Sequence, residues 1–332
     1  MSLARLRVIF AGPHVTVQDS GRPKFLRYGA TAAGPMDRAA FAFANAALGN
    51  PPGAAGVEVS LGGLTLECLE GAVALAVVGG GFRVALDGQA LPSWTTTRLE
   101  PGKRLAIRPG PWGSWTYLAF GGKLRASEWL GSSATHAHSN LGGGAVVTDQ
   151  ILEIDAAPSG EIGAANLGAP DGAPTEPLRV VLGPQDRHFS PEVIARLFAE
   201  AFRLTDAYDR MGARLSGPDL TPASKLDMPS EALLRGSLQV AGDGVATVLL
   251  ADHQTTGGYP KIATMLGADI DRFVQRRAGD EVRFASITPA QAVAFTREEA
   301  ESRRRSARPS AADLAAALLS ENLIGGVVSG EA

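Results

Sequence analysis

A polar loop between two apolar runs carries the residues best suited to chemistry. The run at residues 245–250 is rich in branched side chains, as a buried strand is, and a second apolar run covers residues 262–266. Between them lie polar and ionisable side chains around two adjacent glycines, Gly257 and Gly258. Together these side chains can donate and accept hydrogen bonds and move protons. A simple turn needs few polar residues, so we expect a functional loop on a rigid scaffold, where sites are often found.

Length and composition indicate a globular protein with a large core. The chain has 332 residues, of which 45% are hydrophobic and 20% charged, and this is enough for two domains. A net charge of −3 gives no electrostatic signature for nucleic acid or an anionic membrane. Cys68 is the one cysteine, so no intramolecular disulfide can form, and its apolar neighbours predict a buried thiol. No apolar run has the length of a signal peptide core or a membrane span, so we expect a cytoplasmic protein.

The elements that position the loop are predicted to be mostly short strands. Forty glycines and 21 prolines, with few long helical patterns, favour many strands joined by tight turns, as in barrels and sandwiches. Residues 57–61 alternate as a half-buried strand does, which would place Glu58 on a solvated face. Other strands are expected at residues 15–18, 72–78, 82–86, 95–99, 104–108, 115–120 and 178–182.

Three helices are predicted from their start signals. Asp37 lies in the first turn of one helix, where a carboxylate favours the positive helix end. Ser190 caps a second helix, with Pro191 at its first position. A capping box at residues 288–291 starts a third. The apolar stripe of the first helix consists of Ala40, Phe43, Ala44, Ala47 and Leu48.

Composition divides the chain into two halves of comparable size. Residues 156–177 are rich in Ala, Gly and Pro, as a linker or a long surface loop is. We therefore expect a first domain at 1–155, a second at 178–295 and a helical tail at 296–332.

The two halves also echo each other faintly. Residues 71–79 parallel residues 244–251, and residues 101–107 parallel residues 278–284. Such an echo is what a repeated domain would leave in the sequence.

Several separate blocks resemble the biotin-dependent carboxyltransferase family. The likeness covers roughly residues 14–295. The strongest block is Asp252-x-Gln254-Thr255-Thr256-Gly257-Gly258-Tyr259-Pro260-Lys261-Ile262. The others are Gln18-Asp19-x-Gly21-Arg22, Asp209-Arg210-Met211-Gly212, Ser230-Glu231 and Gly236-Ser237-Leu238-Gln239-Val240.

The family includes the second subunit of allophanate hydrolase-like proteins, the carboxyltransferase region of urea amidolyase and the C subunit of bacterial 5-oxoprolinase. The resemblance implies a mainly β fold of two related cyclophilin-like β-barrel domains with short flanking helices. It also implies an enzyme subunit that works on an amide or lactam. The leading hypothesis is the C subunit of an ATP-dependent 5-oxoprolinase, which opens 5-oxoproline to glutamate together with A-like and B-like partner subunits.

Cofactors are expected outside this chain. It shows no phosphate-binding glycine loop, so ATP is expected to be used by the assembled complex. One alternative is a biotin-dependent carboxyltransferase acting on urea or a similar amide. Biotin would then sit on a separate carrier, because the chain has no Met-Lys-Met. Another alternative is a non-catalytic regulator that binds an inhibitor of a histidine kinase.

Amide chemistry requires donors for an oxygen with developing negative charge and a group that moves protons. The resemblance places these roles on the matching blocks. The candidate catalytic residues are Lys261, Tyr259, Asp252 and Glu231. The candidate substrate-binding residues are Gln254, Thr255, Thr256, Gly257, Gly258, Gln239, Arg210, Gln18, Asp19 and Arg22.

One block departs from the family pattern. Relatives carry Gly-Ser-Arg-Ser-Thr, where this chain has Gly131-Ser132-Ser133-Ala134-Thr135. If the missing arginine binds an anionic substrate group in the family, its loss changes substrate choice here. His136 and His138 follow, but two ligands on a loop are too few for a metal site, and none is predicted.

Overall fold

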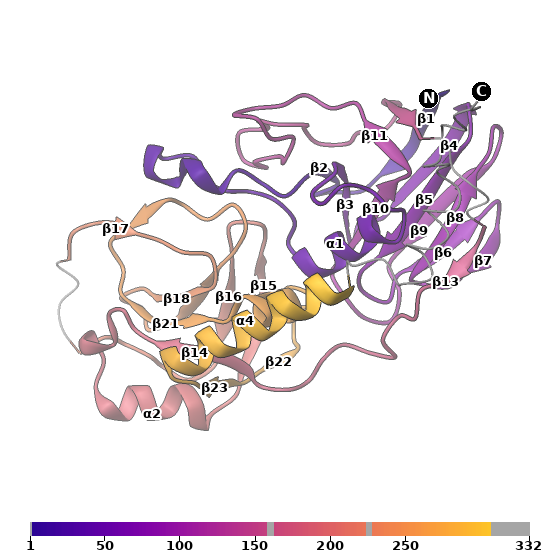
Figure 1. Ribbon diagram of the computed structural model, residues 1–332. Helices are drawn as coiled ribbons and strands as arrows, with labels where there is room; N and C mark the ends of the chain where they lie inside the picture. Colours follow the sequence, from indigo (N-terminus) through magenta and orange to yellow (C-terminus); the bar gives the residue numbers. More distant parts are fainter. Residues whose placement is uncertain (1, 158–162, 224–227, 307–332) are drawn as a thin grey trace, which may run out of the picture. The chain divides into compact units, whose positions relative to one another are not determined.

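The computed structural model describes residues 2–157, 163–223 and 228–306, and these are mainly β (Figure 1). Residues Met1–Thr288 form one compact unit. Helix α4 (Pro289–Ser306) belongs to a second unit and begins where the capping box predicted a helix. No helix in the described ranges combines the length and the hydropathy that a membrane crossing requires. The predicted helical tail at 296–332 begins inside α4, and its residues 307–332 lie outside the described residues.

Two sheets, of seven and six strands, make up the first half of the compact unit. The seven-stranded sheet has the order β11-β12-β1-β4-β9-β6-β7, and the six-stranded sheet β13-β8-β5-β10-β3-β2. The strands of the first are β1 (Ser2–Ala11), β4 (Leu64–Glu70), β6 (Arg83–Leu86), β7 (Gln89–Leu91), β9 (Arg104–Arg108), β11 (Gly122–Leu124) and β12 (Ile151–Ala156). Those of the second are β2 (Thr16–Gln18), β3 (Gly56–Ser60), β5 (Val73–Val78), β8 (Thr95–Leu99), β10 (Trp115–Phe120) and β13 (Ala165–Asn166).

The six-stranded sheet is covered on both faces. On β5, Leu75 and Val77 point into the core shared with the seven-stranded sheet. Their neighbours Ala76 and Val78 point into a second core that reaches into the other half of the unit. A strand buried on both faces is apolar at every position, and this explains the continuous run of β5.

A single eight-stranded sheet forms the second half and curls nearly into a barrel. Its order is β22-β15-β16-β19-β18-β21-β14-β23, so β22 and β23, consecutive in the chain, occupy opposite edges. A separate two-stranded sheet pairs β17 (Glu231–Ala232) with β20 (Thr256–Gly257). Along the chain, β17 comes directly before β18 and β20 directly before β21. The strands of the large sheet are β14 (Leu178–Leu182), β15 (Phe202–Tyr208), β16 (Gly212–Ser216), β18 (Ser237–Val240), β19 (Ala246–Leu249), β21 (Lys261–Met265), β22 (Glu281–Val282) and β23 (Phe284–Ser286).

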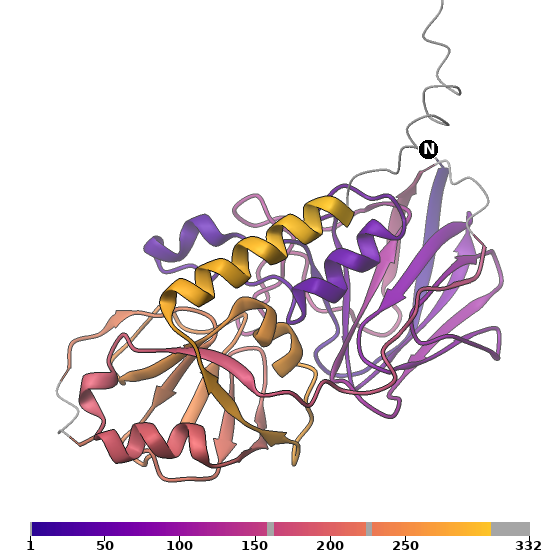
Figure 2. The same cartoon turned by 60° about the horizontal axis from the view of Figure 1, so that its bottom comes forward.

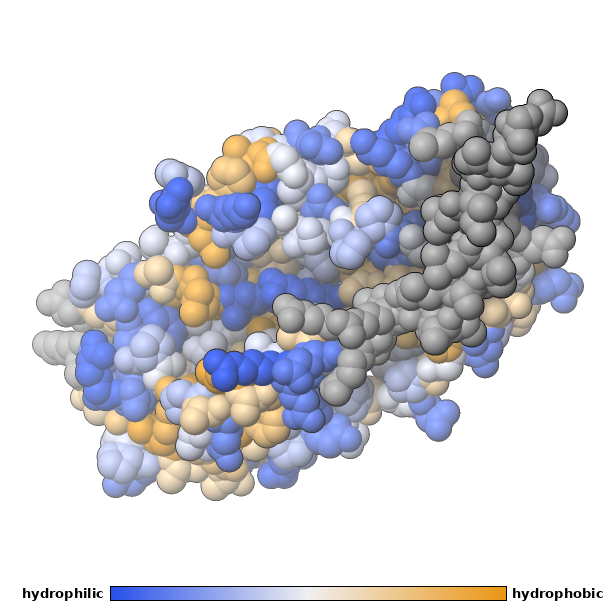
Figure 3. Space-filling model, viewed as in Figure 1, coloured by the Kyte–Doolittle hydropathy of each residue, from blue (hydrophilic) through white to orange (hydrophobic). Residues whose placement is uncertain are grey.

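Short helices cover these sheets (Figure 2). Helix α1 (Arg38–Ala46) packs on β5 and β10, α2 (Pro191–Ala199) packs beside β23, and α3 (Gly267–Phe273) packs beside β14. Two 3-10 turns complete the set, η1 (Pro23–Tyr28) and η2 (Asp186–His188). On the face seen in Figure 3, hydrophobic residues form small separate groups among hydrophilic ones.

The predicted cap at Ser190 is confirmed, whereas Asp37, predicted in the first turn of its helix, is the N-cap residue of α1. The Asp37 carboxylate accepts a hydrogen bond from the Ala40 N–H, and the Ser190 hydroxyl accepts one from the Val193 N–H. The predicted apolar stripe of α1 is wrong at one position: Phe41 is buried, whereas Phe43 is 44% exposed.

Two further predictions are corrected by the sheets. Residues 57–61 were expected to form a half-buried strand, but β3 is buried along its whole length, because it lies inside the six-stranded sheet. Glu58 is therefore fully buried and does not lie on a solvated face. Within the predicted linker, Ala165 and Asn166 pair with β8 and extend the first half. Residues 158–162 of that linker lie outside the described residues, and the predicted domain boundaries stay a prediction.

Candidate active site

The predicted functional loop is held by the short pair of strands β17 and β20. In this pair Glu231 is the register partner of Gly257. The chain then enters β21 at Lys261, so this lysine begins a strand of the large sheet. The loop and the segment that carries Glu231 therefore lie side by side, although they are far apart in the sequence.

The ammonium group of Lys261 is the least satisfied charge of this region. The side chain is 2% exposed, and among the described residues its Nζ finds no hydrogen-bond partner. The nearest carboxylate oxygen is Glu231 Oε2 at 3.7 Å, which is an ion pair but too long for a hydrogen bond. Glu231 itself is 44% exposed. The two residues thus form a buried cation beneath a carboxylate that remains open to solvent.

Gln185, which the sequence analysis did not select, holds both members of this pair. It is 1% exposed and precedes η2. Its Oε1 accepts from the Lys261 backbone N–H at 2.9 Å, and its Nε2 donates to Glu231 Oε2. The only sequence signal was its place in Gly183-Pro184-Gln185, directly after a predicted strand.

Gln239 lies next to Lys261 on the same face of the sheet. The two residues are register partners on β18 and β21, which places their side chains side by side. Among the described residues, Gln239 Nε2 is buried without a hydrogen-bond partner. A Cβ on Gly257 would lie 3.0 Å from this Nε2, so close packing, rather than a positive φ, explains the glycine here.

Two of the remaining loop residues line a hollow of about 540 Å³. Tyr259, 48% exposed, and Gln254 line it together with Gln239. Thr256 is exposed, and the carbonyl of Thr255 accepts from the Leu233 N–H at 3.0 Å. The other lining residues are Asp206, Ala207, Tyr208, Asp209, Met211, Gly212, Arg214, Ala241, Thr247 and Leu249.

Arg210 and Asp252 lie in a closed ion network that joins the two halves of the unit. Arg210 Nε and Nη2 donate to the Asp252 carboxylate at 3.0 and 2.9 Å, and Nη1 donates to Glu58 Oε1. Nη2 also donates to the Gly34 carbonyl at 2.8 Å. All three charged residues are at most 1% exposed. This placement supports a structural part for Arg210 and Asp252, and their catalytic part stays a prediction.

The charges in this network are fixed by one another. Burial alone would lower the pKa of Arg210, but Glu58 and Asp252 outweigh burial and raise it above its ordinary value. Glu58 also accepts from the Tyr117 hydroxyl at 2.9 Å. The guanidinium therefore remains charged.

Gln18, Asp19 and Arg22 are placed together around one segment, residues 129–135. The Asp19 carboxylate accepts from the Ser132 hydroxyl and from the backbone N–H of the next residue, both at 2.7 Å. Arg22 donates to the carbonyls of Trp129 and Ala134, and burial lowers its pKa. Gln18 donates to Thr16 Oγ1 and to the Thr135 carbonyl. These contacts hold the segment that departs from the family pattern. Gln18 Oε1 and Arg22 Nη1 remain buried without a hydrogen-bond partner among the described residues.

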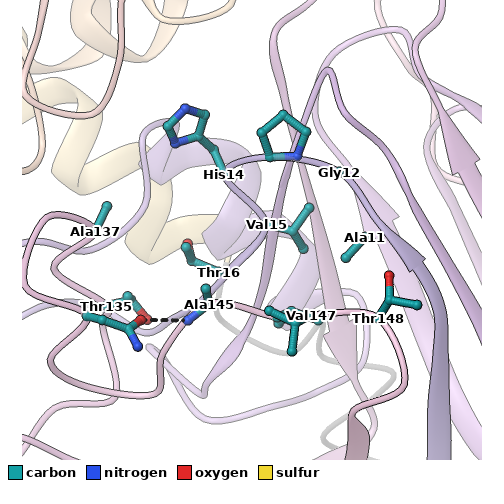
Figure 4. Close-up of a pocket in the computed structure, with 13 residues that line it drawn as sticks. Ala11, Gly12, His14, Val15, Thr16, Thr135, Ala137, Ala145, Val147 and Thr148 are labelled. Atoms are coloured by element: carbon teal, nitrogen blue, oxygen red, sulfur yellow. Dashed lines mark hydrogen bonds between the residues drawn. The ribbon is translucent and has the colours of Figure 1, made fainter.

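This segment is tied to the second half through Asp252, whose Oδ2 accepts from the Ala137 N–H at 2.9 Å. Beside it is a hollow of about 370 Å³, shown in Figure 4, with His14 at one rim and Val147 across from it. At its border the Asn140 side chain accepts from the Ala145 N–H. Among the described residues, no group of three or more His, Cys, Asp and Glu side chains is arranged to hold a metal.

Comparison with known proteins identifies the family. Residues 28–286 match the family described as carboxyltransferase domain, subdomain A and B. The chain is 32% identical to the C subunit of 5-oxoprolinase from Escherichia coli, over 87% of this chain and 93% of that protein. It is 26% identical to urea amidolyase of Saccharomyces cerevisiae, over 85% of this chain and 17% of that protein. The crystal structure of TTHA0988 matches with a TM-score of 0.77 at 31% identity, covering 86% of this chain and 56% of that one.

This chain therefore belongs to the carboxyltransferase domain family, subdomain A and B. The predicted family resemblance is confirmed, and so is the predicted mainly β, barrel-like fold.

Proposed function

We propose that this chain is the C subunit of an ATP-dependent 5-oxoprolinase. Together with A-like and B-like subunits it hydrolyses the lactam of 5-oxoproline to glutamate. The relative named as the C subunit of 5-oxoprolinase supports this proposal, because the likeness extends over nearly the whole of both chains. The observation that carries it is the solvent-open Glu231 above the buried Lys261 ammonium.

This pair suits the proton transfers that opening a lactam requires. Water must lose a proton as it attacks the carbonyl carbon, and the ring nitrogen must gain one as the C–N bond breaks. Glu231 is the member that solvent and substrate can reach, and its carboxylate lies 3.7 Å from the Lys261 ammonium. Tyr259, at the rim of the hollow, can donate a hydrogen bond to the substrate.

ATP supplies the activation of the amide oxygen in such a reaction, but the hollow beside the loop does not fit a triphosphate. Asp206 and Asp209 line it, and the guanidinium of its one arginine, Arg214, is paired with Asp243. Like charges would repel the phosphates there. We therefore assign ATP binding to the partner subunits and route no step through it here.

A second candidate function is carboxyl transfer from carboxybiotin to urea or a similar amide, with biotin on a separate carrier. The family match and the urea amidolyase relative favour it. The orphaned nitrogens Lys261 Nζ and Gln239 Nε2 fit a ureido oxygen. Both are shielded, so a ligand oxygen meets them only when the Glu231 side chain swings aside. Biotin would supply the carboxyl group.

Reconstitution tests the proposal. We expect the chain to co-elute with a B-like subunit when the two are co-expressed. It should open 5-oxoproline only when an A-like subunit is also present with ATP. The isolated chain should neither hydrolyse ATP nor cleave 5-oxoproline. Robust turnover by the isolated chain, or separate elution of the two proteins at micromolar concentration, would contradict the multi-subunit proposal.

The alternatives give different results in the same experiment. Activity only with a biotin carboxylase and a biotinylated carrier would establish the carboxyltransferase function. Binding to a kinase inhibitor of the B-like type, without turnover in either assay, would establish a regulator. An assembled complex that hydrolyses 5-oxoproline establishes the first.

A further inference from the structure

Gln185 makes three hydrogen bonds to the candidate catalytic pair. Its backbone N–H donates to the Lys261 carbonyl at 3.2 Å, and its Oε1 accepts from the Lys261 N–H at 2.9 Å. Its Nε2 donates to Glu231 Oε2. The amide can face only one way, because the Lys261 N–H requires an oxygen on its side. The nitrogen must therefore face Glu231.

One carboxylate oxygen of Glu231 faces both a neutral donor and a cation. Glu231 Oε2 accepts from Gln185 and lies 3.7 Å from Lys261 Nζ. Glu231 lies on the two-residue strand β17 and is 44% exposed, so little besides this contact restrains its side chain. Gln185 is buried, and its side chain is hydrogen-bonded to the backbone of Lys261, the first residue of β21. The rigid member of the group is thus the glutamine, and the free member is the glutamate.

We propose that Gln185 is a positioning residue that holds Glu231 over Lys261, so that Lys261 acts on the substrate through Glu231. This inference rests on the proposed function for its reaction. Glu231 is the group that contacts the substrate amide and accepts the proton from water. The hydrogen bond from Gln185 Nε2 and the nearby charge of Lys261 fix where the Glu231 carboxylate lies, so that it is held in place to take this proton. Gln185 itself does not touch the substrate.

Gln185→Glu separates this role from a purely structural one. A glutamate keeps an oxygen acceptor for the Lys261 N–H, so the entry to β21 stays clamped. It replaces the Nε2 donor with a second carboxylate oxygen beside Glu231. Two carboxylates that share a site retain a proton to higher pH than one does. In the assembled complex we expect the acid limb of the kcat profile to move up by about one pH unit or more.

One matched variant serves as the control. Gln150 also accepts a backbone N–H through Oε1, from Val147 at 3.0 Å, but in the first half of the unit. Gln150→Glu makes the same chemical change there and should leave the acid limb in place.

A measurement without turnover keeps this inference separate from the proposed function. Mass spectrometry after brief amine acylation of the isolated chain reports how open each lysine is. Lys261, 2% exposed, should react at least about tenfold more slowly than Lys103, whose side chain is 50% exposed. In Gln185→Leu, Glu231 is released and Lys261 should react faster, while Lys103 serves as the unchanged reference.

The outcomes are distinct. A shifted acid limb in Gln185→Glu, absent in Gln150→Glu, supports the positioning role. An unmoved limb in an active complex overturns it and leaves 5-oxoprolinase activity standing. If no complex turns over, the proposed function fails. Faster acylation of Lys261 in Gln185→Leu then supports the positioning geometry, and an unchanged rate overturns it.

Discussion

Two buried cations, Arg210 and Lys261, lie in the same half of this protein but differ in how many hydrogen bonds their charged groups make. Arg210 donates to Glu58, Asp252 and the Gly34 carbonyl, and solvent reaches none of its charged partners. Lys261 Nζ makes no hydrogen bond to a described residue and faces a half-open carboxylate. A closed network fixes the packing of the two halves, whereas an open one leaves bonding capacity for a substrate. We expect this difference to separate structural from chemical residues among the blocks that match the family.

Removing the closed cation should have the largest effect. Arg210→Met leaves Glu58 and Asp252 buried without a countercharge, so we expect a loss of about 3–5 kcal/mol in the free energy of unfolding, measured by urea denaturation. Arg214→Met is the matched control. Its surface pair with Asp243 is half exposed, so the change there should stay below about 1 kcal/mol. Equal effects at both sites would contradict the closed-network interpretation.

Stability should also depend on pH through Asp37. Burial, reinforced by Asp271, raises the pKa of Asp37 to about 7 from its ordinary value of 3.8. The folded state then holds a proton that the unfolded state has released. The free energy of unfolding should therefore fall as pH rises from about 4 to 7, by at most about 1.4 kcal/mol per pH unit. Asp37→Asn keeps the helix cap and should flatten this fall in denaturation curves taken across that range. A slope that persists in the variant would exclude Asp37 as its source.

Removing the open cation should affect turnover and leave stability nearly unchanged. Lys261→Met should lower the kcat/KM of the assembled complex roughly a hundredfold, since one charged donor contributes about 3 kcal/mol to a transition state. Glu231 remains solvated, so no buried charge is left behind and thermal denaturation should hardly change. Turnover at the wild-type level would contradict a catalytic part for Lys261.

The smallest effect is expected at the rim. Tyr259→Phe removes one hydroxyl from a side chain that is 48% exposed. A single neutral hydrogen bond contributes about 0.5–1.5 kcal/mol, so turnover should fall roughly two- to tenfold, with stability unchanged. If neither this variant nor Lys261→Met loses activity, the search for the site moves to Gln18, Asp19 and Arg22.

Local patterns predicted the strands well because the information is local. Runs such as residues 104–108 and 115–120 are bounded by turn residues, and the observed strands β9 and β10 have the same bounds. The burial of Glu58 was mispredicted because it depends on Arg210, 152 positions away in the chain. Gln185 was missed for the same reason, since its side-chain partners lie 46 and 76 positions away. Alternation within one strand contains nothing about such partners.

Two strands that follow each other in the chain, β22 and β23, form the two edges of the eight-stranded sheet, and their short length limits how another protein can bind there. The edges are the two-residue β22 and the three-residue β23, separated in the chain by one residue, Arg283. A strand from another chain would find no long row of free backbone groups on this sheet to continue the ladder. The same closure protects the second half from edge-to-edge aggregation. Association at this sheet must therefore rely on side chains and loops, so single surface substitutions can dissect it.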